Sequence, residues 1–171
     1  MKVMWVKAMT SKREFEDIRN IRECLLQYGL TPELEKRQFL NRKNLLEHLE
    51  GEYGIDGIKK EEMPEFVKKV LKENEGKTID EFGETLLGLG VLLGETAIEG
   101  KEDRHWLWDK THASCIVTSG DEVFGIDPAF ALNYAWQKQK SENVDRLCED
   151  LFGDWEWING GGDFGGEIAG D

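Results

Sequence analysis

Histidine and cysteine, the side chains that most often act as bases, nucleophiles or metal ligands, are few and widely spaced in this chain. His105 and His112 do not have the spacing of a zinc-binding helix motif, and no third ligand is obvious. Cys24, Cys115 and Cys148 form no Cys-x-x-Cys pair, so the simplest expectation is three buried free thiols. We therefore predict no catalytic residues, no metal ion and no cofactor.

Carboxylates are so numerous that the closeness of any two of them would carry little information. Glu95 stands apart because it ends a glycine-rich, apolar segment. If the chain were an enzyme, a hydrolase using Glu95 with His105 or Asp109 would be the candidate. The simpler interpretation is that Glu95 is a helix-surface or capping residue.

Charge is the most informative bulk property of the sequence. Among 171 residues, 22 Lys and Arg face 35 Asp and Glu, which gives a formal net charge of −13. Such a surface repels phosphate backbones, so nucleic acid is not expected as a partner. Acidic balance often serves solubility alone, but it also favours a basic protein partner.

The acidic charge is densest at the C-terminus, where no basic residue follows Arg146. The tryptophans of this region offer large apolar surfaces of the kind that anchor protein contacts. The alternative is that they fold back on the sheet as a final strand. The predicted partner-binding residues are Glu149, Asp150, Asp154, Trp155, Glu156, Trp157 and Asp163.

Periodicity and capping signals predict an α+β fold, with an antiparallel sheet of three to four strands packed against several helices. Residues 11–76 read as helices, with a break near Asn41 and a loop from Gly54 to Gly57. Residues 78–152 read as a capped helix, a β-meander over 105–126 and two further helices. Residues 3–9 could add a strand. We expect one domain over 1–152, followed by an acidic, glycine-rich tail or terminal strand over 153–171.

The predicted helix after Thr78 carries a stripe of small residues, and each interior glycine costs about 0.5–1 kcal/mol relative to alanine. Close approach of another helix or of the sheet would offset that cost. The stripe consists of Gly83, Gly90, Gly94 and Ala97.

The segments Leu89–Glu95 (LGVLLGE), Trp106–Trp108 (WLW) and Phe124–Pro128 (FGIDP) together carry a family resemblance. Residues 78–152 resemble a bacterial domain family of unknown function with an L-G-x-x-L-G-E helix, a W-x-W strand and a proline-initiated helix. The resemblance implies a small α+β module without established catalytic residues. Families of this kind recur among accessory and immunity-type proteins of bacteria.

These observations together predict a binding protein rather than an enzyme. The leading hypothesis is an immunity protein that neutralises a cognate bacterial toxin by occluding a basic surface of that toxin. The alternatives are a ligand-binding or adaptor protein, and the Glu95 hydrolase. The N-terminus lacks the apolar length of a signal peptide, and the most apolar stretch is too short for a membrane span, so we expect a cytoplasmic protein without membrane contact.

Overall fold

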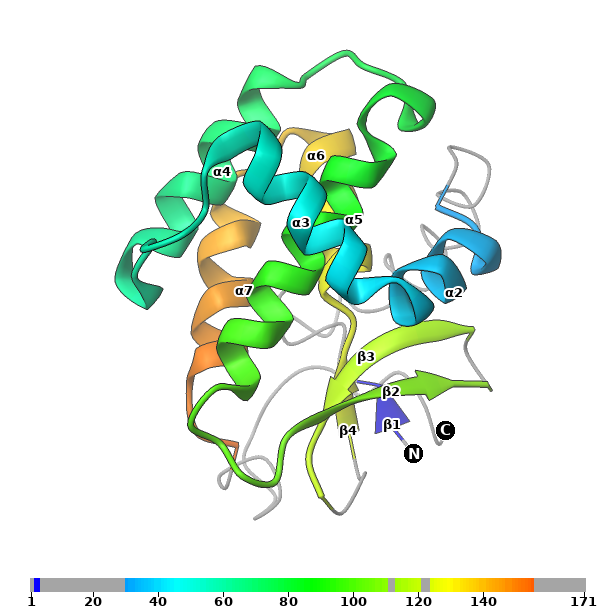
Figure 1. Ribbon diagram of the computed structural model, residues 1–171, viewed down its shortest axis with the longest axis vertical. Helices are drawn as coiled ribbons and strands as arrows, with labels where there is room; N and C mark the ends of the chain where they lie inside the picture. The colour runs from blue at the N-terminus through cyan, green and yellow to red at the C-terminus, as the bar shows by residue number, and fades with distance from the viewer. Residues whose placement is uncertain (1, 4–29, 111–112, 121–123, 156–171) are drawn as a thin grey trace.

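The computed structural model describes residues 2–3, 30–110, 113–120 and 124–155. Helices stand above one end of a small β-sheet, which confirms the α+β class (Figure 1). The helix expected within residues 11–28, and with it Cys24, lies outside the described residues.

The sheet has the strand order β1-β4-β3-β2. Strands β2 (His105–Asp109), β3 (Ser114–Thr118) and β4 (Phe124–Ile126) form the predicted antiparallel meander. Strand β1 (Lys2–Val3) joins the other side of β4, and it runs parallel to β4. The N-terminal segment therefore does contribute a strand, although only its first residues lie within the described part of the chain.

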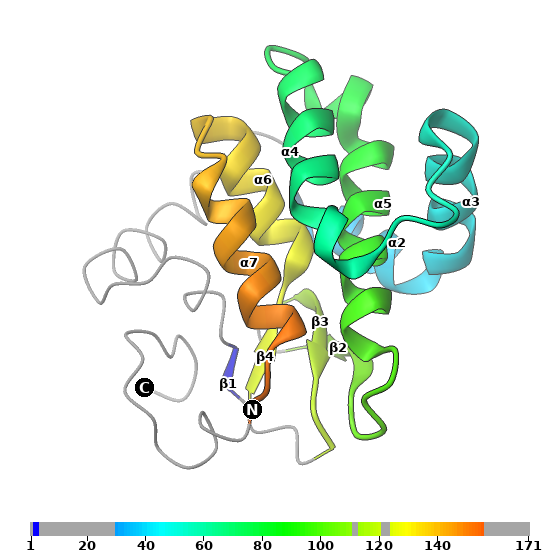
Figure 2. The same cartoon turned by 90° about the vertical axis from the view of Figure 1, so that its left-hand side faces the viewer.

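The described helices follow the expected order. They are α2 (Pro32–Leu40), α3 (Arg42–Tyr53), a 3-10 turn (Lys60–Glu62), α4 (Met63–Glu73), α5 (Ile79–Ile98), α6 (Pro128–Lys138) and α7 (Glu142–Phe152). Turned by 90°, the molecule shows α4, α6 and α7 side by side on one flank (Figure 2).

Side-chain caps fix the starts of α2, α5 and α6. Thr78 and Glu81 form the predicted capping box at the start of α5. The Asp127 side chain caps α6 by accepting a hydrogen bond from the Phe130 N–H at 2.9 Å. Asn41 separates α2 from α3, as expected. Helix α3 ends at Tyr53, where Gly54 supplies the left-handed residue with a φ of 64°.

Helix α5 is the centre of the fold, buried over most of its length and in contact with α3, α6 and α7. The glycine stripe explains how these elements approach. A Cβ at Gly90 would lie 2.6 Å from the Gln38 Nε2 atom and 3.3 Å from the Ala129 nitrogen, and one at Gly94 would overlap the Trp106 ring. The prediction of close approach is confirmed at these two positions. It is wrong at Gly83, where a Cβ would meet only the Ile79 side chain of the same helix.

Cys115 and Cys148 are buried free thiols, as predicted. Burial raises the pKa of both, that of Cys148 to about 12, so neither thiol ionises readily. None of the helices in residues 30–155 that the structure describes is long and apolar enough to cross a bilayer.

Candidate functional site

Trp155, predicted to anchor a partner, is part of the core. Only 5% of the residue is exposed, and its indole Nε1 donates a hydrogen bond to the Asp150 carbonyl oxygen at 2.7 Å. The expectation of an exposed ring at this position is therefore corrected. The ring folds back, as the alternative held, but it follows α7 in an extended turn and not in a strand.

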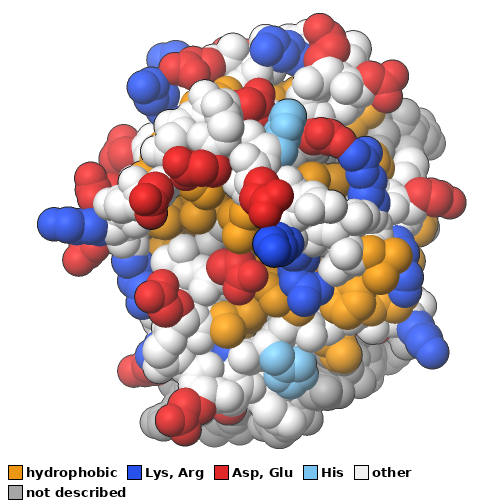
Figure 3. Space-filling model, viewed as in Figure 1, with side chains coloured by type: hydrophobic (Ala, Val, Ile, Leu, Met, Phe, Trp, Pro, Cys, Tyr) orange, Lys and Arg blue, Asp and Glu red, His pale blue; other side chains and the backbone are white. Residues whose placement is uncertain are grey.

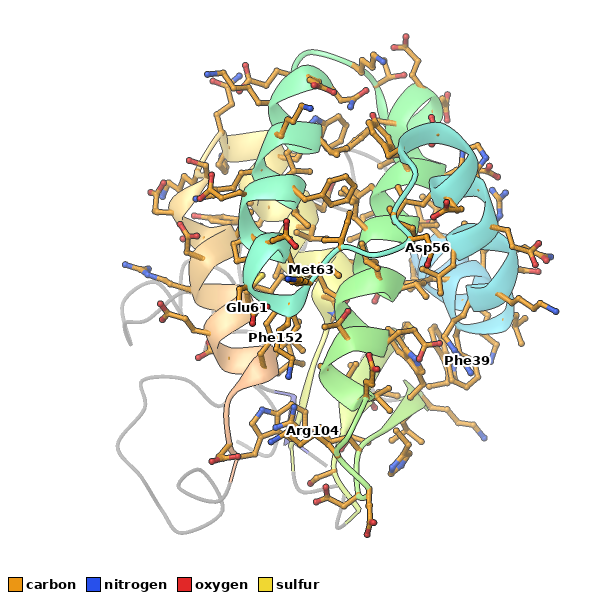
Figure 4. All side chains as sticks on the ribbon, turned by 60° about the vertical axis from the view of Figure 1, so that its left-hand side comes forward. Phe39, Asp56, Glu61, Met63, Arg104 and Phe152 are labelled. Atoms are coloured by element: carbon orange, nitrogen blue, oxygen red, sulfur yellow. The ribbon has the colours of Figure 1, made fainter. Side chains whose placement is uncertain are left out.

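Arg104 is the residue that holds Trp155 in place. Its guanidinium carbon lies 3.7 Å from the centre of the Trp155 ring. The same group donates hydrogen bonds to the carbonyl oxygens of Ala97, Leu151 and Gly153, and so ties the end of α5 to the end of α7 (Figure 4). Burial lowers the pKa of Arg104 below its usual value, but arginine remains charged at neutral pH. Sequence reasoning missed Arg104, since nothing local to it points to Trp155.

The other predicted C-terminal residues fall into two groups. Glu149 and Asp154 are exposed, Asp150 is half-buried, and Asp154 pairs with Lys101 at 3.2 Å. Glu156, Trp157 and Asp163 lie outside the described residues. The structure thus brings together the acidic residues at the end of α7, without an exposed aromatic anchor at position 155.

The residues proposed for an enzyme lie on two different elements. Glu95 is exposed on α5, His105 is half-buried on β2, and Asp109 is buried at the end of that strand. His112 lies outside the described residues. Across the described ranges, no three His, Cys, Asp or Glu side chains gather in a way that could hold a metal ion.

A shallow groove of about 430 Å³ lies along the connection between α3 and α4. Leu46 and Ile55 supply its apolar lining, and both pack on the main core. Its charged lining residues in the described part of the chain are three carboxylates: Glu47, Glu50 and Asp56. We call this feature the acidic groove.

The geometry of the acidic groove is fixed by the end of α3. Gly54 turns the chain in the left-handed conformation, and the Glu50 Oε2 atom accepts a hydrogen bond from the Asp56 N–H at 2.8 Å. The Ile58 N–H then donates to the Ile55 carbonyl oxygen at 3.2 Å, which closes the turn. Figure 4 shows Asp56 on this connection, with Met63 at the start of α4 nearby. The carboxylates are therefore held on the last turns of α3 and on the short, hydrogen-bonded turn that follows it.

A second surface of different character lies where α2 meets β2. The Lys36 ammonium is 4.5 Å from the centre of the Trp108 ring, and the Arg42 guanidinium is 5.0 Å from that of Phe39. Leu40, beside them, is 67% exposed. In the space-filling view, apolar side chains gather in a patch at the right-hand side of the molecule, with Lys and Arg side chains beside it (Figure 3). The side that carries α2 and α3 thus combines apolar area with charge.

Comparisons of the chain with protein-family models, with curated proteins and with solved structures found no match. The fold and the surfaces define the class: a small α+β protein whose two described grooves are lined by charged and apolar side chains.

Proposed function

We propose that this protein is a non-catalytic binding protein that pairs one-to-one with a basic protein through the acidic groove. The observation that carries this proposal is the combination of Glu47, Glu50 and Asp56 with the apolar side chains of Leu46 and Ile55 in one shallow groove. A site made of carboxylates and aliphatic groups binds cations that carry an apolar stem.

An arginine or lysine side chain of the partner has that chemistry. Its methylene groups can cover Leu46 and Ile55 while its charged head lies between Glu47 and Asp56. An arginine side chain would bind more tightly than a lysine side chain, because its guanidinium can form two parallel hydrogen bonds to one carboxylate. The groove is open and shallow, which suits the protruding side chain of a protein better than an enclosed small molecule.

The charge of the whole chain supports the same partner. A net charge of −13 creates a negative field that speeds the approach of a basic protein and disfavours acidic competitors. The exposed Glu149 and Asp154 at the end of α7 add to that field. In this proposal they steer the partner, and the acidic groove supplies the contact.

The biological role that fits such a pairing is that of a cytoplasmic immunity protein. A partner toxin that binds an anionic substrate needs a basic surface, and an acidic inhibitor can cover that surface directly. The net charge of −13 supports this role. The acidic groove is its contact site.

The proposal is tested with matched baits. Immobilised wild-type protein is compared with Glu47→Lys/Asp56→Lys and with a control, Glu95→Lys/Glu99→Lys, which changes the net charge equally at exposed positions on and just after α5. Lysate of the native host is passed over each bait in low salt, and the retained proteins are identified by mass spectrometry.

We expect a basic protein that wild type and the control variant retain and that the groove variant loses. Toxicity of that protein on expression, relieved by co-expression of wild type but not of the groove variant, would support the immunity role. Equal loss from both variants would show that only overall charge matters. A retained partner that is acidic, or that the groove variant binds normally, would overturn the proposal.

A further inference from the structure

A cleft of about 510 Å³ lies on the flank where α4, α6 and α7 lie side by side (Figure 2). Leu71, Ala135 and Trp136 form its apolar wall, and each is largely buried. A volume of this size is typical of sites for small organic molecules. We call this feature the lysine cleft, after the charged residues at its mouth.

The lysine cleft reverses the charge balance of the molecule. Its lining holds Lys68, Lys69 and Lys72 against Glu65 and Glu75, in a chain whose acidic residues exceed its basic ones by 13. The Lys68 ammonium forms ion pairs with Glu65 at 2.6 Å and with Asp145 at 3.1 Å. The Lys69 side chain, which is 74% exposed, lies 4.0 Å from the Glu73 carboxylate. Lys72 makes no ion pair with any residue that the structure describes.

Gln139 gives an independent indication at the opposite side of the cleft. It ends α6 in the left-handed conformation, with a φ of 54°, where glycine is the favoured residue. A non-glycine residue held there carries backbone strain, and such strain concentrates at ligand-binding positions. Its amide side chain can donate and accept hydrogen bonds toward a polar ligand group.

From these observations we infer that the lysine cleft binds a small amphipathic organic anion: one carboxylate, sulfonate or phosphate group on a flat apolar body. The apolar body lies against Trp136 and Leu71, and the anionic group is met by Lys72 and Lys69. Gln139 completes the polar side of the site. This site is separate from the acidic groove, and the inference does not depend on the proposed function.

The probe for the test is 8-anilinonaphthalene-1-sulfonate, which has this chemistry and fluoresces when it leaves water. Binding is titrated in wild type, in Lys69→Glu/Lys72→Glu, and in a control of equal charge change, Lys43→Glu/Lys110→Glu, at exposed lysines outside the cleft. A further variant, Ser141→Trp, fills the mouth of the cleft without any change in charge. Circular dichroism checks that each variant is folded.

We expect one saturable site in wild type and in the control, and dissociation constants at least about tenfold weaker in the lysine and Ser141 variants. N-phenyl-1-naphthylamine, which lacks the sulfonate, should bind about tenfold more weakly than the anionic probe. Gln139→Gly should weaken binding and yet raise the denaturation midpoint, because it removes the strain. No saturable binding to wild type, or binding that neither lysine replacement nor Ser141→Trp reduces, would overturn the inference.

Discussion

Gly90→Ala tests directly how closely α5 packs against its neighbours. The added Cβ would lie 2.6 Å from the Gln38 Nε2 atom and 3.3 Å from the Ala129 backbone nitrogen. Neither neighbour can yield easily. Gln38 is fully buried and its Nε2 donates to the Leu87 carbonyl oxygen at 3.0 Å, while Ala129 belongs to the backbone of α6.

The expected change in the free energy of unfolding of Gly90→Ala follows from three contributions. Alanine is favoured over glycine in a helix by about 0.5–1 kcal/mol. Overpacking costs about 1–3 kcal/mol, and displacing the buried Gln38 amide from its hydrogen bond costs about 1–3 kcal/mol. The mid-range sum is a loss of about 3 kcal/mol in the free energy of unfolding.

The assay is urea denaturation followed by circular dichroism, with Gly51→Ala as the matched control. Gly51 is exposed on α3, and a Cβ there would meet no atom within 4 Å. The same chemical change should therefore stabilise the protein at position 51 by about 0.5–1 kcal/mol and destabilise it at position 90. If Gly90→Ala stabilises the protein as much as Gly51→Ala does, α5 is not packed as described.

Three further predictions follow from single residues. Arg104→Lys should lower the free energy of unfolding by about 1–3 kcal/mol, because a lysine cannot bind three carbonyl oxygens and the Trp155 ring together. The control Arg37→Lys, at an exposed ion pair, should change it by less than about 1 kcal/mol. Equal effects of the two substitutions in urea denaturation would contradict the role of Arg104. The hydrogen bond from the Thr78 N–H lowers the pKa of Glu81 below its ordinary 4.5, so the carboxylate stabilises the fold above pH 4.5 and this contribution is lost as the pH falls through the folded-state pKa. The difference in denaturation midpoint between wild type and Glu81→Gln should therefore shrink in acid. A difference that stays constant with pH would refute this linkage. Iodoacetamide should label Cys115 and Cys148 only after denaturation, as read by mass spectrometry, and rapid labelling of either in native protein would show that it is not buried.

The features that the sequence predicted well are those whose causes are local. Thr78, Asp127 and Pro128 mark helix starts through hydrogen bonds and ring geometry within a few residues, so the starts of α5 and α6 follow from the sequence. The alternation in β2 and the β-branched residues of β3 likewise predicted the meander.

The features that escaped prediction depend on contacts between distant segments. Trp155 looked like an exposed anchor because its neighbours in the sequence are polar and glycine-rich. It is held in the core by Arg104, which lies far from it in the sequence, just before β2. The acidic groove escaped for a related reason. The loop from Gly54 to Gly57 was predicted, but not the turn after α3 that brings Ile55 and Asp56 beside Leu46 and Glu47.

The most direct test of the central claim is the association rate constant of the captured basic partner, measured by surface plasmon resonance over a range of salt concentrations. Raising the salt from about 0.1 M to about 1 M shortens the screening length from about 10 Å to about 3 Å. We predict a steep fall in the rate for wild type and for Glu95→Lys/Glu99→Lys. The Glu47→Lys/Asp56→Lys variant should also dissociate faster, because it lacks the paired contact in the acidic groove. A rate indifferent to salt in wild type, or unchanged dissociation of the groove variant, would contradict the proposal that this protein binds a basic partner through the acidic groove.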